Sequence, residues 1–302
     1  MGNKYELTIQ DIDANIKRFM TYIYGTAVSS KNPIVEFVVA GPGAGKTGVE
    51  TYIKNQKKKE GGRLSSVSSD IIATFHPNYE DLTEEDSDTR YIETRKFVRP
   101  AAPEIYENMI KNKISIVNEQ TFDKGQSDFD FVKKFKEGGY QTNINILATD
   151  IFISRLSCFE REAAMLEIGE TPRGIPKEDQ YKMYNSFVKE IEEFISLDLI
   201  DNVRIYTRGK SINKPNLVYD EKSSNANDFV EIINAERQKQ RDEIIKNPVE
   251  YLKRLERVKN VIEENGINEV LTRDALAGIE ELEKDFYDLI SKNKNTDSIE
   301  RE

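Results

Sequence analysis

The sequence predicts an α/β fold in which a mostly parallel sheet carries helices on both faces, with a helical appendage after it. Apolar or β-branched runs that suit buried strands alternate with helical patterns as far as Tyr219. The first run leads directly into a glycine-rich turn, and no convincing strand is predicted after Tyr219. Alternating strands and helices are typical of parallel sheets, because a crossover between parallel strands needs a helix.

The elements follow in order along the chain. Residues 8–24 predict an amphipathic helix, since apolar residues recur there at three- and four-residue spacing. Strands are then predicted at 34–39, 65–69, 114–118, 143–148 and 202–207. The sequences GGR at 61–63 and EGGY at 137–140 predict turns before strands.

The C-terminal part has a different pattern. Residues 226–292 predict two or three helices, one of which begins at Asn247-Pro248. We expect its apolar face to contain Val249, Leu252, Leu255, Val258 and Ile262. We therefore predict two domains, residues 1–222 and residues 223–302, the second ending in a polar tail.

Composition limits the function classes. The 302 residues carry a formal net charge of −10, which argues against general affinity for nucleic acid or for anionic membranes. The single cysteine, Cys158, and the single histidine, His76, exclude an intrachain disulfide and cysteine- or histidine-rich metal sites. There is no signal-peptide pattern and no long apolar run, so we expect a cytoplasmic protein without a membrane span.

The glycine-rich turn has the pattern of a phosphate-binding loop. Residues 40–47, AGPGAGKT, fit [AG]-x4-G-K-[ST] between a strand and a helix, whereas a turn that only connects the two is the structural alternative. Glycines let the backbone adopt positive φ, so that N–H groups point at phosphate oxygens. We expect Lys46 to reach the β- and γ-phosphates and the Thr47 hydroxyl to ligate Mg²⁺. The predicted nucleotide-binding residues are Gly41, Gly43, Ala44, Gly45, Lys46, Thr47 and Gly48. This motif predicts a P-loop nucleoside-triphosphate-binding fold.

Three acids follow predicted strands. Asp70 can take a proton from an acceptor hydroxyl that attacks the γ-phosphate, or it can cap the helix that follows it. Glu119 and Asp150 can each bind a Mg²⁺-bound water, bind substrate hydroxyls, or cap the next helix.

Other polar residues have a functional and a structural interpretation. Arg161 and Arg173 can neutralise charge on a transferring phosphoryl group, although many helical arginines form only weak surface pairs. For His76 we favour a structural role in the turn after Asp70, because buried histidines are usually hydrogen-bonded. We expect Cys158 to be a small buried hydrophobe.

Several of these motifs, in this order, resemble the zeta toxins of bacterial toxin–antitoxin systems, which are kinases of UDP-N-acetylglucosamine. The matching segments are AGPGAGKTG, D-x5-H-P-x-Y from Asp70 to Tyr79, NEQT at 118–121, FERE around Arg161, PRGIPKE from Pro172, and VRIYTR at 203–208 followed by VYD. The resemblance covers about residues 5–220.

The resemblance implies roles for individual residues. Lys46 and Thr47 would bind ATP or GTP with Mg²⁺, and Asp70 would be the base that activates the sugar 3′-hydroxyl. Glu119 and Thr121 would contact the amino sugar, with Gln120 in place of the family's glycine. Arg161 and Arg173 would stabilise the transferred charge. The implied partners are the nucleotide-sugar substrate and a small helical antitoxin.

Two positions depart from the family pattern. Ala73 stands where family members often have arginine three residues after the base, and Asp123 stands where they often have arginine after the motif threonine. An anion close to a diphosphate is unfavourable in a partly desolvated cleft. We therefore expect an intact phosphoryl-transfer site and an altered acceptor site.

The sequence supports three hypotheses for function. The first is a toxic kinase that phosphorylates UDP-N-acetylglucosamine, or another nucleotide sugar, and so depletes a cell-wall precursor. The second is a P-loop ATPase or nucleotide switch, in which Glu119 or Asp150 is the metal-side acid and the C-terminal helices transmit the nucleotide state. The third is a helical interaction module, residues 226–292, on an inert scaffold.

Overall fold

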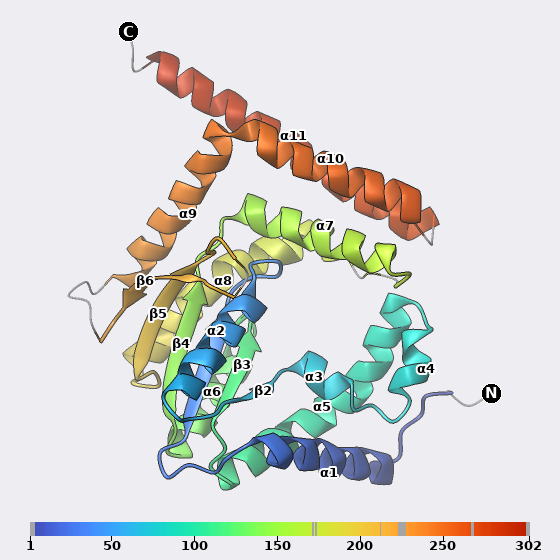
Figure 1. Cartoon of the computed structure of the whole chain (residues 1–302), viewed down its shortest axis with the longest axis vertical. Helices are drawn as coiled ribbons and strands as arrows, with labels where there is room; N and C mark the ends of the chain where they lie inside the picture. Colours follow the sequence, from blue (N-terminus) through green and yellow to red (C-terminus); the bar gives the residue numbers. More distant parts are fainter. Residues whose placement is uncertain are drawn as a thin grey trace. The chain divides into compact units, whose positions relative to one another are not determined.

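The computed structural model describes residues 4–299 apart from 171, 173, 212, 223–227 and 267–268. The chain divides into two compact units. The first consists of Met1–Val39, Lys46–Leu147 and Ser186–Asn227, and the second of Ala40–Gly45, Ala148–Asn185 and Asp228–Glu302. The first unit contains the sheet, and the second is built from helices (Figure 1).

The sheet of the first unit has six strands in the order β2-β3-β1-β4-β5-β6. Their bounds are β1 Ile34–Val39, β2 Ser65–Val67, β3 Ile116–Gln120, β4 Gln141–Leu147, β5 Asn202–Thr207 and β6 Asn216–Asp220. All neighbouring pairs are parallel except β5 with β6, which is antiparallel. The predicted mostly parallel α/β sheet is therefore confirmed.

The predicted strands differ from the observed ones at some ends. The strands predicted at 34–39 and 202–207 have the observed bounds, whereas β3 begins two residues later and β4 two residues earlier than predicted. β6 was not predicted as a strand. Most of β6 is exposed, so it lacks the buried apolar pattern by which a strand is found from sequence.

Helices cover both faces of the sheet. The first unit contains α1 Ile9–Thr26, α2 Lys46–Lys59, α3 Ser69–Ala73, α4 Tyr79–Thr83, α5 Ser87–Lys111, α6 Gln126–Glu137 and the second half of α8, Lys177–Ser196. Successive strand residues face opposite sides, so Glu36 and Phe37 mark the two faces of β1. On the Phe37 face, α6 contributes Phe135, whose ring centroid lies 5.8 Å from that of Phe37. On the other face, Tyr52 of α2 contacts Tyr206 of β5.

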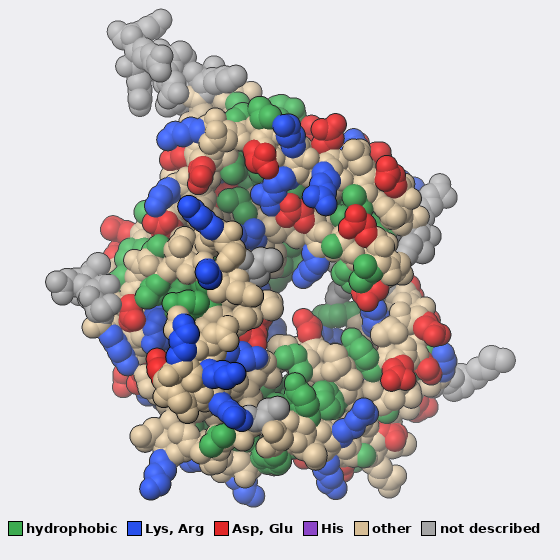
Figure 2. All heavy atoms as spheres, viewed as in Figure 1, with side chains coloured by type: hydrophobic (Ala, Val, Ile, Leu, Met, Phe, Trp, Pro, Cys, Tyr) green, Lys and Arg blue, Asp and Glu red, His purple; other side chains and the backbone are tan. Residues whose placement is uncertain are grey.

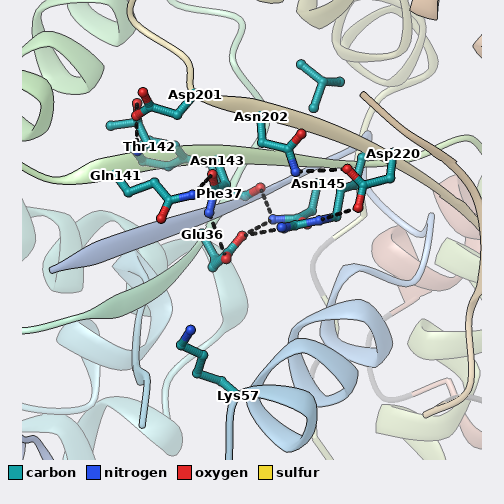
Figure 3. Close-up of polar contacts among 12 residues, drawn as sticks. Glu36, Phe37, Lys57, Gln141, Thr142, Asn143, Asn145, Asp201, Asn202 and Asp220 are labelled. Atoms are coloured by element: carbon teal, nitrogen blue, oxygen red, sulfur yellow. Dashed lines mark hydrogen bonds and ion pairs between the residues drawn. The ribbon is translucent and has the colours of Figure 1, made fainter. Parts of the chain in front are cut away.

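The face under α2 holds a buried polar network, drawn in Figure 3. The Glu36 carboxylate accepts hydrogen bonds from Asn143 (2.9 Å) and Asn145 (2.8 Å) of β4 and from Arg204 of β5 (3.3 Å). Arg204 also donates to Asp220 of β6 at 3.3 Å. Removing one partner from such a buried charged network typically costs about 3–5 kcal/mol, because the remaining charge is left uncompensated. These contacts join β1 to β6 across the sheet.

The second unit is built around α7 Ile151–Glu167, with α9 Phe229–Lys246, α10 Pro248–Asn265, α11 Glu269–Ile299 and the first half of α8. The prediction of a C-terminal helical region is thus confirmed. Its core joins Leu156 and Phe159 of α7 to Leu255 of α10 and Phe286 of α11. The predicted apolar face of α10 is correct except for Val249, which is 63% exposed. Outside this core, basic and acidic side chains alternate over the C-terminal helices, at the top of Figure 2.

Candidate active site

The phosphate-binding loop connects β1 to α2. β1 ends at Val39 and α2 begins at Lys46, so the loop lies where the motif predicted it. Gly43 and Gly45 have φ of 72° and 104°, a region that side chains with a Cβ rarely adopt. An added Cβ at Gly43 would lie 2.2 Å from the Ser154 carbonyl oxygen, so this position also requires glycine for space. The two glycines therefore do more than connect the strand to the helix.

Side chains of the second unit fix the orientation of two loop peptides. The Thr149 hydroxyl donates to the Ala44 carbonyl at 3.2 Å, and the Ser154 hydroxyl donates to the Pro42 carbonyl at 2.5 Å. In a planar trans peptide the N–H points opposite to the C=O. The N–H groups of Gly43 and Gly45 therefore point away from Ser154 and Thr149, which is the orientation needed to present them to an anion.

In the first unit, the start of α2 lies beside the end of β3. The Thr47 hydroxyl donates to the Glu119 carboxylate at 3.0 Å. Burial raises the pKa of the Glu119 carboxyl and Glu50 raises it further, while Lys46 and Thr47 lower it. A hydroxyl next to a carboxylate is a set of oxygen donors of the kind that Mg²⁺ prefers, so Thr47 and Glu119 fit the expected ion.

Glu50 extends this cluster along α2. Its carboxylate accepts a short hydrogen bond from the Ser66 hydroxyl of β2, and Ser66 in turn accepts from the Lys54 ammonium at 2.5 Å. Among the described residues no group of three or more His, Cys, Asp or Glu side chains is arranged to hold a metal ion.

Asp70 lies on α3, just after β2. Its side chain is exposed, and the helix is capped by Ser68, whose hydroxyl accepts from the Ile71 N–H at 3.2 Å. The alternative interpretation of Asp70 as the N-cap is therefore wrong. β2 pairs with β3 so that Val67 lies opposite Asn118. Asp70 thus follows the carboxyl end of β2, and Glu119 lies among the last residues of the adjacent parallel strand β3, at the edge where open α/β sheets bind ligands.

The structure narrows the roles of the other two acids. Asp150 is fully buried and caps α7, because one carboxylate oxygen accepts from the Phe152 N–H at 2.9 Å. Its other oxygen accepts two hydrogen bonds from Arg241. Asp150 is therefore a structural residue and not a ligand of a metal-bound water. Glu119 caps no helix, since Gly125 is the N-cap of α6.

The predicted acceptor-binding residue Thr121 lies in the loop after β3. Its hydroxyl donates to Asp123 at 2.7 Å, which leaves the oxygen lone pairs for another donor. Phe122, between them, is buried with a φ of 44°, which is rare for a bulky residue. The unexpected anion at position 123 is thus held in place by the threonine that the family motif assigns to the substrate.

The sequence of this chain matches a known protein family. The sequence model of the zeta toxin family matches residues 21–224, which is more than half of the chain. The chain belongs to the zeta toxin family. None of the curated proteins matches it.

Two solved structures are similar to this zeta toxin. One comes from the PezAT chromosomal toxin–antitoxin system of the human pathogen Streptococcus pneumoniae. Its TM-score is 0.65 at 19% sequence identity, and the aligned part covers 83% of this chain and 100% of that chain. The other, from the AvrRxo1-ORF1:AvrRxo1-ORF2 complex with sulphate ions, has a TM-score of 0.52 at 13% identity, with coverages of 89% and 84%. At these identities both support the fold.

Family membership gives the coarse activity. Zeta toxins are P-loop kinase toxins, so this protein is a phosphotransferase that uses a nucleoside triphosphate. No helix in the described part of the chain has the length and apolarity needed to cross a membrane.

Of the two arginines of the zeta toxin motif, Arg161 lies within the described residues. Arg161 is exposed on α7. Arg173 lies outside the described residues. Arg155, six residues before Arg161 on α7, is almost fully buried and donates to Asp285 of α11 at 3.0 Å. Of Arg155 and Arg161, only Arg161 is therefore accessible to a ligand.

His76 has the structural role that we favoured. Its Nδ1 accepts from the Asn78 N–H at 3.1 Å, and burial lowers the pKa of its imidazole. Cys158 is fully buried on α7, as expected. Both residues thus have the buried, structural surroundings that were expected.

Three polar residues near the loop were missed from sequence. Glu50 had a usable signal, since it lies three residues after Thr47 and so shares a face of α2. Thr149 and Ser154 had none, because they reach Ala44 and Pro42 only through the tertiary fold.

Proposed function

We propose that this zeta toxin transfers the γ-phosphate of ATP or GTP to the 3′-hydroxyl of UDP-N-acetylglucosamine or a related nucleotide sugar. The observation that carries the proposal is the arrangement at the carboxyl edge of the sheet. Thr47 contacts Glu119, and Asp70 follows the next strand along. A threonine of the phosphate-binding motif with an acid beside it, and an exposed carboxylate after the next strand, suit phosphoryl transfer to a hydroxyl.

Asp70 is the proposed general base. Its carboxylate accepts the proton of the acceptor hydroxyl as the hydroxyl oxygen bonds to the γ-phosphorus. The bond from that phosphorus to the β–γ bridging oxygen breaks, and ADP or GDP leaves. No hydrogen bond of the Asp70 side chain occurs among the described residues, and Ser68 rather than Asp70 caps α3, so its lone pairs are available to the substrate.

The nucleotide is held by the loop and by the start of α2. The N–H groups of Gly43 and Gly45 and the N-terminus of α2 would bind the phosphates, and the Lys46 ammonium would offset charge on the γ-phosphate. Thr47 would hold Mg²⁺, with Glu119 close enough to bind a water of the ion. When bound, Mg²⁺ spreads the negative charge of the triphosphate.

The acceptor is oriented by Glu119 and Thr121. The Asp123 carboxylate beside Thr121 favours a hydroxyl-rich part of the acceptor over its diphosphate at this point. Arg161 and Arg173 are proposed to stabilise charge on the phosphoryl group.

The cellular consequences follow from the reaction. Phosphorylation of UDP-N-acetylglucosamine in the cytoplasm would drain a cell-wall precursor, so the active protein would harm bacteria. A toxin of this kind needs a partner that blocks it, and we propose a small helical antitoxin that covers the nucleotide site.

The test is a direct phosphotransfer assay with wild type and Asp70→Asn. Each protein is incubated with MgATP or MgGTP and a panel of UDP-sugars, and mass spectrometry looks for a gain of one phosphate. We expect UDP-N-acetylglucosamine to gain it, and Asp70→Asn to lower turnover about 10²- to 10⁴-fold with unchanged nucleotide affinity. Equal turnover of the two proteins would rule out Asp70 as the base.

A second function is a P-loop ATPase or nucleotide switch. It is favoured by the Thr47–Glu119 contact, because an acid beside the metal-binding threonine also suits water-directed hydrolysis. Release of inorganic phosphate without any phosphorylated sugar in the same assay would support it.

A further inference from the structure

Helix α9 holds the segment that follows β4 at three points. The Gln240 side-chain amide donates to the Ala148 carbonyl at 2.7 Å and accepts from the Asp150 N–H at 3.2 Å. Arg241 donates through Nε (3.0 Å) and a terminal nitrogen (2.8 Å) to one oxygen of Asp150. Two adjacent residues of α9 thus fix both the backbone and the side chain of this segment.

This attachment is buried and specific. Asp150 is fully buried, and its two carboxylate oxygens are used by Arg241 and by the Phe152 N–H. A buried carboxylate that loses its cation is strongly destabilised. The two-nitrogen contact requires the planar guanidinium, so lysine would keep the charge but not the geometry.

The same segment reaches the phosphate-binding loop. Thr149, between the two residues that Gln240 holds, is buried and donates to the Ala44 carbonyl. That carbonyl shares a planar peptide with the Gly45 N–H, so a shift of Thr149 turns the N–H away from its phosphate-binding direction. Hydrogen bonds therefore lead from α9 through residues 148–150 to the loop.

A second contact of α9 reaches the start of the loop. One turn before Arg241, the Arg237 guanidinium lies 3.7 Å from the centre of the Tyr184 ring and donates to the Tyr184 carbonyl at 3.1 Å. The backbone of Tyr184 is close to Gly41, since a Cβ added at Gly41 would lie 3.9 Å from the Tyr184 Cα. Both routes begin on α9 and end on the loop.

We propose that Arg241 and Gln240 are positioning residues for nucleotide binding, which act on the loop through Asp150 and Thr149. The inference rests on the proposed binding of ATP or GTP by residues 40–48. α9 begins at Phe229, beyond residues 21–224, which match the family. Arg241 and Gln240 therefore lie in the part of the chain outside the match. Through them the C-terminal helices have a role in the affinity of the loop for nucleotide.

The test compares Arg241→Lys with Arg254→Lys. Arg254 makes an equivalent two-nitrogen contact with Glu160, at 2.8 and 2.9 Å, in the same unit, and neither residue contacts the loop in the described structure. Affinities for ATP and GTP are measured by calorimetry beside thermal melts of each full-length protein. We expect Arg241→Lys to weaken nucleotide binding about tenfold and Arg254→Lys to change it by less than about twofold.

A second pair of variants tests the route and does not depend on the folding of Arg241→Lys. Thr149→Val, which removes the hydroxyl, should weaken binding about tenfold, while Thr149→Ser should stay within about twofold of wild type. Adding Arg241→Lys to the Thr149→Val protein should change the free energy of nucleotide binding by less than about half of the change that Arg241→Lys causes in wild type. Both substitutions act on the same peptide, so their effects should not add.

The outcomes separate this inference from the proposed function. If wild type binds nucleotide and both Arg241→Lys and Thr149→Val bind it equally well, the inference is wrong and the proposed function stands. The same holds if Arg241→Lys lowers the melting temperature but not the affinity. If wild type binds neither ATP nor GTP, both fail.

Discussion

Two loops follow parallel strands at the same edge of the sheet, and they are built in opposite ways. In the loop after β1, positive φ occurs at Gly43 and Gly45, where it causes no steric clash, and other segments hold the loop carbonyls. In the loop after β3, positive φ occurs at the bulky Phe122 as well as at Gly125, and Thr121 donates to Asp123 within the loop. The first loop fixes the direction of the Gly43 and Gly45 N–H groups, and the second fixes side chains instead.

This difference indicates which ligand each loop is suited to bind. A triphosphate is recognised by backbone N–H groups, so a loop for it must control peptide planes. In the proposed function the acceptor hydroxyl would be recognised by side chains, so the loop after β3 would have to control their positions, even with a strained residue. Substitutions that act on one loop should therefore leave the other ligand's affinity unchanged.

The largest effect should come from Gly43→Ala. Its Cβ would lie 2.2 Å from the Ser154 carbonyl oxygen and 2.7 Å from the Cys158 sulfur, so the loop must move away from α7. Displacement of about 1 Å in a positioned site can cost about 10²-fold, and we expect at least that loss in nucleotide affinity. Calorimetric titration with MgATP measures it.

Gly125→Ala is the matched control in the other loop. Gly125 has a φ of 56°, but no atom lies within 4 Å of its would-be Cβ. Only backbone strain of about 1–3 kcal/mol is expected there, visible in thermal melts, with nucleotide affinity unchanged. The contrast between the loops is wrong if both variants lose nucleotide affinity alike.

The nucleotide side of the site was largely predictable from sequence. Lys46 begins α2 directly after the loop, because the motif combines glycine spacing with local backbone chemistry. β1 was predictable for a similar reason, since its run 34–39 is apolar apart from Glu36 and almost fully buried. Both signals are local in the chain.

The remaining features depend on tertiary structure. No residue pattern predicts positive φ at Phe122, a bulky residue whose ring contacts Phe37 and Phe194 from distant parts of the chain. The fold likewise decided that Ser68 and not Asp70 caps α3, since both are good caps by composition. Arg241 is far from Asp150 in sequence, so their pairing could not be inferred.

The next largest effect concerns a buried carboxyl on α7, the helix behind the first loop. Burial raises the pKa of Glu162 from 4.5 to about 7, against a smaller opposing effect of Arg161. Between these values the folded state binds more protons than the unfolded state, so stability falls as pH rises. Relative to wild type, Glu162→Gln should gain about 2–3 kcal/mol between pH 4.5 and pH 8.

Urea unfolding at the two pH values checks this, with Glu167→Gln as the control. Glu167 lies on the same helix but is exposed, so its substitution should leave the pH dependence as in wild type. If the free energy of unfolding changes with pH by the same amount in wild type and in Glu162→Gln, the fold does not hold the Glu162 carboxyl in its protonated form.

The smallest effect tests the second loop through Asp123→Asn. The asparagine oxygen can still accept from the Thr121 hydroxyl, so the loop should keep its shape while one negative charge is lost. A single half-exposed charge is worth about 1 kcal/mol, so KM for an anionic nucleotide sugar should fall about fivefold, with unchanged affinity for ATP. Steady-state kinetics over both substrates separates the two. A change in ATP affinity with unchanged KM for the sugar would contradict the division between the loops, because Asp123 would then act on the nucleotide.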